Sequence, residues 1–110
     1  MNTEYLASAR GLIERARLGP HIEISYKAAF GAVEAYADGR IFITCGKFGV
    51  GLKLPADACQ SLMDEGAGKP LKYFEKGHVK KNYVVLSPTI LDDQSRLNAL
   101  LRQSMTFAQV

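Results

Sequence analysis

The sequence predicts an α+β fold, a two-layer sandwich in which an antiparallel sheet carries helices on one face. Apolar residues recur at three- and four-residue steps near both ends of the chain and in one central segment, which is the period of amphipathic helices. Between these segments, apolar and polar residues alternate in short runs typical of strands. Tight-turn residues join the runs, so neighbouring strands should be antiparallel. The expected order is helix, several strands, helix, two strands, helix.

The length and composition indicate one globular domain over residues 1–110. The chain is 47% hydrophobic and 23% charged, which is ordinary for a protein that folds in water. No apolar run approaches the roughly 20 residues that a membrane span needs. The first residues also lack the basic and then apolar segments of a signal peptide. We therefore expect a cytoplasmic protein with no membrane partner.

The cysteines and histidines give no sign of a metal site. Cys45 and Cys59 are the only cysteines, and in a reducing cytoplasm both should be free thiols. Each falls on an apolar stripe, so we interpret both as buried and unreactive. His21 lies on the polar side of a predicted strand, and His78 is far from it in the sequence. Without clustered ligands of zinc-site spacing, the sequence predicts neither metal nor cofactor.

Three helices are expected. The first covers residues 3–18 and stops at Gly19-Pro20. The second covers residues 55–66 and closes at its final glycine. The third begins after Asp92 or Asp93, either of which could cap it, and its last residues, 106–110, are expected to fray.

Residues 32–45 predict a hairpin that turns at Asp38-Gly39. A strict two-residue turn would place Glu34 on the face of Ile43. A bulged three-residue loop instead aligns Val33 and Ala35 with Cys45 and Ile43 on one apolar face, and we prefer it. Under this interpretation Tyr36 and Phe42 lie together on the opposite face.

The segment "CGKFGVGLKLP", residues 45–55, contains three glycines and two lysines and so invites comparison with phosphate-binding loops. Such loops need a helix directly after the glycines, and here an alternating strand follows. A hairpin with a four-residue loop, 46–49, would pair Cys45 with Val50, Ile43 with Leu52 and Ile41 with Leu54. Because all six then share one apolar face, we predict a hairpin.

A further hairpin is predicted from the stretch between Pro70 and Ser87, turning near Gly77-His78. The unbroken apolar run 83–86 suggests an inner strand that is covered on at least one face. Five lysines and one glutamate lie between Lys69 and Lys81, a local charge of +4, whereas the rest of the chain carries −1. Basicity confined to one segment is the pattern to test for an anionic partner.

Four stretches together resemble the N-terminal domain of TfoX-type proteins, the competence regulators also called Sxy. They are "KAAFGAVEAYADGRIFI", "GVGLKLP", "GAGKPLKYFEKG" and "KKNYVVLSPTILDD", and the resemblance runs from about Ser25 to Met105. Ala29 and Ala32 replace the family's methionine and second glycine, and an extra serine precedes Pro88. The positions that match the family pattern include Phe30, Gly31, Gly39, Phe42, Lys53 and Tyr83.

The resemblance implies a fold of the kind grouped with secretion-chaperone-like domains, and it implies no established reaction. Full-length regulators of this type carry a second, helical domain, so the resemblance suggests an N-terminal module that stands alone. The sequence shows no Ser/His/Asp set, no Cys/His pair and no clustered carboxylates, and we therefore predict no catalytic residue. The first functional hypothesis is a binding or regulatory module that contacts a protein partner or forms a homodimer.

Two other hypotheses remain open from the sequence. One is nucleic-acid binding through the lysines of the 69–81 hairpin, with Tyr73, Phe74 and Tyr83 as stacking rings. The same lysines could instead blunt a sheet edge, with the rings packed inward. The other is a small-molecule or enzymatic role for Lys53 in a pocket beside Phe42 and Tyr36. The lysines of the possible anion-binding hairpin are Lys69, Lys72, Lys76, Lys80 and Lys81.

Overall fold

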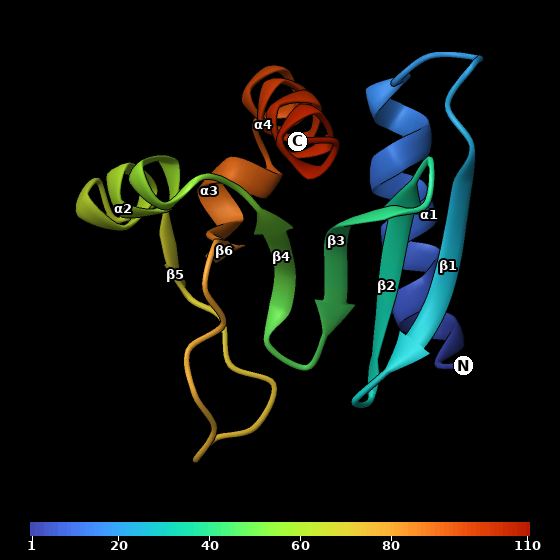
Figure 1. Cartoon of the computed structure of the whole chain (residues 1–110). Helices are drawn as coiled ribbons and strands as arrows, with labels where there is room; N and C mark the ends of the chain where they lie inside the picture. The colour runs from blue at the N-terminus through green and yellow to red at the C-terminus, as the bar shows by residue number, and fades with distance from the viewer.

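A computed structural model describes residues 1–110 and shows a six-stranded antiparallel sheet with helices packed on one face (Figure 1). This confirms the predicted α+β class. The strand order is β1-β2-β3-β4-β6-β5. The strands are β1 (Ile24–Ala29), β2 (Ala32–Ala37), β3 (Arg40–Gly46), β4 (Gly49–Lys53), β5 (Gly68–Pro70) and β6 (Tyr83–Leu86). The helices are α1 (Thr3–Ala16), α2 (Ala56–Asp64), α3 (Pro88–Leu91) and α4 (Gln94–Ala108), one more than the three expected. The additional helix is the short α3, which Ser87 caps by accepting the N–H of Ile90.

The ends of α1 are held by side chains from near and far in the sequence. The Asn2 side chain accepts the backbone N–H of Tyr5 at 2.9 Å and so caps the first turn. At the other end Arg17 adopts a left-handed conformation with φ of 48°. The Arg102 guanidinium of α4 donates to the carbonyl oxygens of Ala16 and Arg17, at 3.3 and 2.9 Å. These contacts satisfy carbonyls that a helix end leaves unpaired and join α1 to α4.

The β2–β3 hairpin has the predicted register but a different turn. Asp38 and Gly39, with φ of 49° and 80°, form a two-residue turn, because Ala37 pairs with Arg40. The extra residue lies inside β3, where the register shifts between Ile41 and Ile43. Phe42 is that residue.

The bulge corrects the predicted position of Phe42. Its side chain turns into the helix-side core and is 0% exposed, so it does not share the opposite face with Tyr36. Ile41 pairs with Tyr36 instead, and the predicted pair of Ile41 with Leu54 does not form. The pattern could not locate the bulge because both Ile41 and Phe42 are apolar.

The β3–β4 segment is a hairpin, as predicted, and a strand rather than a helix follows its turn directly. Cys45 pairs with Val50, and Ile43 pairs with Leu52. The loop is shorter than expected: because Gly46 pairs with Gly49, only Lys47 and Phe48 form the turn. Gly49 has a φ of 111°, which residues with a side chain rarely adopt.

The β5–β6 hairpin is much shorter than predicted, since only residues 68–70 pair with residues 84–86. Residues 71–82 between these strands form a long loop, in which Gly77 donates its N–H to the Phe74 carbonyl at 2.8 Å. In Figure 1 this loop, coloured yellow to orange, lies away from α1, α2 and α4. β6 is an inner strand, as predicted, and Val84 and Leu86 point into the core.

The C-terminal helix is packed to its end, so the prediction of a frayed tail was wrong. Asp93 caps α4 through the N–H of Arg96 at 3.2 Å. Ser104 donates its hydroxyl to the Phe42 carbonyl at 2.8 Å, and Ala108 is buried. Gln109 then donates to the Ala37 carbonyl at 2.9 Å. These contacts anchor the last turn on the β2–β3 hairpin.

Both cysteines are free thiols, and both are buried, as predicted. Burial raises the pKa of Cys45 to about 12 and also raises the pKa of Cys59. No group of three or more metal-ligating side chains lies together in the structure. None of its helices is both long and apolar enough to span a membrane.

Candidate binding surface

The 71–82 loop folds over the sheet face that the helices leave open. Leu71 is fully buried there and packs with Tyr83 and Val85, in a cluster separate from the helix-side core. Gly51 makes this approach possible, because a Cβ at that position would lie 2.9 Å from the Leu71 Cδ1 atom. The glycine at position 51 therefore serves close packing between β4 and the loop.

Tyr73 ties the loop to the two strands beyond β4. Its hydroxyl oxygen lies 3.2 Å from Oε2 of Glu34 on β2 and 3.3 Å from Oγ1 of Thr44 on β3. Tyr36 donates to the other carboxylate oxygen of Glu34 at 3.4 Å. Glu34 is only 8% exposed, so these tyrosines supply hydrogen bonds that water would otherwise provide. The network fixes the position of the Tyr73 ring on the open face.

Two lysines complete this face through contacts with aromatic rings. The Lys80 ammonium lies 5.0 Å from the ring centroid of Tyr73 and 4.9 Å from that of Tyr83. Lys27 lies 5.3 Å from the ring centroid of Tyr36. Lys80 therefore holds the loop against the sheet and covers two of the rings that the nucleic-acid hypothesis requires.

Burial shifts the pKa of the tyrosines in this network. The pKa of Tyr73 rises to about 12, mainly through desolvation, and the neighbouring Glu34 charge adds to the shift. The pKa of Tyr83 is raised further, again mainly by burial. Burial is also the largest cause of the raised pKa of Tyr36, and the negative charge of Glu34 is the next.

This arrangement predicts a late step in the alkaline titration of the folded protein. Because the pKa of Tyr73 is raised from 10.0 to about 12, its stabilising contribution is fully present below pH 10 and is lost as the pH rises through 12. We expect part of the tyrosinate absorbance to appear only towards pH 12, and Tyr73→Phe to remove part of that late step. A single step near pH 10 in the native protein would contradict the network.

Four aromatic rings meet at one side of the 71–82 loop, and we call them the aromatic cluster: Phe30, Phe48, Tyr73 and Phe74. The Tyr73 ring centroid lies 5.4 Å from that of Phe30 and 5.5 Å from that of Phe48. Phe30 and Phe74 lie 6.2 Å apart, edge to face. Phe30 remains 68% exposed and Phe74 61% exposed. The cluster is thus held at its centre and open to solvent at its edge.

Phe30 occupies a backbone position that disfavours it. Phe30 and Gly31, with φ of 51° and 77°, form the two-residue turn between β1 and β2. Asparagine or glycine usually occupies the first position of such a turn, and a bulky residue there costs about 1–2 kcal/mol. The contacts of Phe30 with the Tyr73 and Phe74 rings at best offset this strain and leave most of its side chain exposed, which points to a role in binding.

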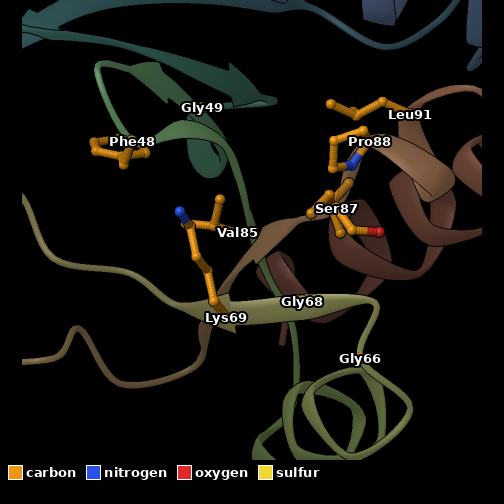
Figure 2. A pocket seen from close by; sticks show the side chains of 10 residues that line it. Phe48, Gly49, Gly66, Gly68, Lys69, Val85, Ser87, Pro88 and Leu91 are labelled. Carbon is orange, nitrogen blue, oxygen red and sulfur yellow. The ribbon is translucent and has the colours of Figure 1, made fainter.

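Three hollows follow one another along the aromatic cluster. The first, about 430 Å³, lies between the β3–β4 turn and α3. The Lys69 side chain reaches from β5 toward Val85 on its wall (Figure 2). The second, about 510 Å³, shares the Phe48 wall with the first. The third, about 130 Å³, shares Tyr73 and Phe74 with the second. The second hollow is lined by Lys47, Phe48, Lys72, Tyr73, Phe74 and Glu75.

The positions that match the family pattern lie in different parts of the structure and do not form one site. Gly39 forms the β2–β3 turn and Phe42 lies in the core, so neither reaches the open face. Lys53 does point to that face, where it pairs with Tyr83 of β6 and is half-buried. The pocket expected for Lys53 beside Phe42 and Tyr36 is not formed, because the bulge in β3 sends Phe42 to the other side of the sheet.

The lysines of the 69–81 segment do not form one patch. Lys69 lines the first hollow and Lys72 the second, whereas Lys80 contacts the two tyrosines. Lys76 and Lys81 are exposed and line none of the hollows. Sequence reasoning missed Phe48, Lys47 and the Glu34 network. An aromatic residue inside a tight glycine-flanked turn was the available signal for Phe48.

The fold and this surface define a small α+β module with an exposed aromatic cluster beside lysines. Residues 16–108 match the TfoX N-terminal domain family, and the match covers nearly the whole chain. The chain therefore belongs to the TfoX N-terminal domain family, as the sequence resemblance indicated. A comparison with curated protein sequences finds no match.

Proposed function

We propose that this protein is a binding and regulatory module that acts through protein–protein contacts made by the aromatic cluster. The single observation that carries the proposal is Phe30, an exposed aromatic side chain held in a left-handed turn. Aromatic residues are enriched at the energetic centres of protein interfaces, and here two exposed rings lie side by side. Covering them would remove apolar surface from water, which favours association.

Membership in the TfoX N-terminal family supports a role like that of competence-regulator modules, and we extend this to a cytoplasmic site of action. The two buried free thiols fit a reducing compartment. The partner could be another protein or a second copy of the chain. β1 is a six-residue edge strand, which is a common route to pairing between copies.

Nucleic-acid binding through residues 69–81 is the second candidate, favoured by the lysines of this segment. Base stacking needs free ring faces. Tyr83 is buried, however, and the Lys80 ammonium lies over both tyrosine rings. Phe74 is then the one exposed ring of the three proposed for stacking. Protein contacts fit this arrangement better.

The test is a double variant, Phe30→Asn with Phe74→Ser. Asparagine suits the turn, so the relief of about 1–2 kcal/mol of strain should offset the lost ring contacts and leave Tm nearly unchanged. We expect the variant to lose at least about tenfold in partner binding, since truncated hot spots cost 2 kcal/mol or more. Cross-linking in native extract, with mapping of the linked residues and mass in solution, gives the readout.

Val79→Ser is the matched control, because Val79 lies in the same loop and is 51% exposed but lines none of the three hollows. It should retain full binding. Cross-links that map to the helix side, or that persist unchanged in the double variant, would overturn the proposal. A shift in mass lost only in the double variant would identify the partner as a second copy.

A further inference from the structure

We propose that the aromatic cluster and its hollows bind an extended acidic peptide segment that carries large apolar side chains. This inference rests on the proposed function and names the chemistry of the partner. It follows from the shape of the hollows, their lining and the unpaired charge around them.

The hollows suit successive side chains of one extended chain. Neighbouring hollows share a wall: the Phe48 ring separates the first from the second, and Tyr73 with Phe74 separates the second from the third. Phe48, Val85, Leu86 and Leu91 are the four hydrophobic residues among the ten that line the first hollow (Figure 2). Hollows that combine apolar and polar lining and share aromatic walls match apolar side chains spaced along a peptide.

The charge along this row is positive and unpaired. Lys69 lines the first hollow, and Lys47 and Lys72 line the second, where Glu75 is the one acidic residue. The protein's one ion pair joins Arg96 to Glu65. None of the three lysines forms an ion pair, and they outnumber the single glutamate, Glu75, along the row. A partner with acidic residues between its apolar ones would complement them.

The lining favours a peptide over a single nucleic-acid strand. A nucleic-acid strand gains affinity from phosphate contacts and from stacking on ring faces. The Tyr73 ring lies under the Lys80 ammonium and meets Phe48 edge to face. Phe48 is the only ring that lines the first hollow, and the rest of its hydrophobic lining is aliphatic, with Val85, Leu86 and Leu91. A base therefore finds at most one ring to stack on there.

The binding test uses fluorescein-labelled peptides of about 12 residues, which extend to about 40 Å. That length covers the 35 Å longest extent of the protein. Each peptide carries two leucines, at varied spacings, in an aspartate and serine background. One matched set replaces aspartate by lysine, another replaces leucine by serine, and labelled oligothymidine of similar length is the nucleic-acid probe. Fluorescence anisotropy with the full chain should show at least one acidic leucine peptide that binds about tenfold tighter than both its lysine counterpart and its serine counterpart.

Charge reversal locates the site. Lys69→Glu with Lys72→Glu should weaken the acidic peptide about tenfold and strengthen the lysine peptide, whereas Lys76→Glu should do neither. All three lysines are exposed, so the fold should be retained, and Tm confirms this. Phe48→Ser removes the wall between the first two hollows and should weaken leucine peptides more than serine peptides.

Two results would overturn the inference. Equal binding of all peptides, or no binding, would show that the hollows do not select acidic apolar segments. Tighter binding of oligothymidine, with a steep loss at higher salt, would assign the lysines to nucleic acid. Neither result depends on the Phe30 and Phe74 double variant. If that variant still lost its cross-links, the contact surface would stand and only the partner chemistry would be wrong.

Discussion

Replacing Phe42 by alanine should lower the free energy of unfolding by about 3–5 kcal/mol. Its ring is 0% exposed and belongs to the core cluster between the sheet and the helices. Removing it would leave a cavity next to α4, whose Ser104 donates to the Phe42 carbonyl. If β3 had no bulge, the Phe42 ring would lie on the open face, and its removal would cost little. The size of the loss therefore tests the β3 bulge directly.

Ile41→Ala is the matched control for this experiment. Ile41 pairs with Tyr36 and is only half-buried, so its replacement should cost less than about 2 kcal/mol. Urea unfolding of both variants gives the two free energies, provided that the free energy of unfolding falls with urea concentration at the same slope, the m value, in each. The bulge would be misplaced if Ile41→Ala proved the more damaging change.

Gly68→Ala should also destabilise the protein strongly. An added Cβ would lie 2.5 Å from the Val84 Cγ2 atom and 3.2 Å from the Val85 carbonyl oxygen. Val84 is fully buried on the inner strand β6, and Val85 O belongs to the backbone, so neither can move freely. Overpacking of this kind costs about 1–3 kcal/mol or more, and here it would push β5 away from β6.

Gly11→Ala provides a control of opposite sign. Gly11 lies within α1, and the nearest atom to an added Cβ is the end of the flexible Arg15 side chain at 3.0 Å. Alanine there should stabilise the protein by about 0.5–1 kcal/mol, because glycine disfavours a helix interior. Thermal unfolding of both variants should shift Tm in opposite directions. Equal shifts would contradict the close packing at Gly68.

The binding surface depends on the same packing that these variants test. The loop that carries Tyr73 and Phe74 is held by Leu71, which lies over Gly51, and by the hydrogen bonds to Glu34 and Thr44. Val85 forms part of this packing and also lines the first hollow. Changes under the loop should therefore alter binding as well as stability, whereas exposed lysines can be changed alone.

The alternation of apolar residues allowed two strand registers to be predicted. Cys45 was matched with both Val33 and Val50, and the structure has both pairs. A shift by one residue would turn every apolar side chain of a strand to the wrong face, so the pattern leaves little freedom. The inner position of β6 followed from its unbroken apolar run, because a strand covered on both faces has apolar residues at every position.

The sequence by itself therefore determined the fold class, the order of the elements apart from the short α3, two of the five strand registers and the family. It could do so because alternately buried and exposed positions require alternating apolar and polar residues. Only the tertiary structure decided whether Ile41 or Phe42 enters the core, since both side chains are apolar enough to be buried there. It also decided the binding surface. Phe30, Phe48 and Tyr73 come from three separate turns and loops, which carry no period, and they meet because the 71–82 loop folds back over the sheet.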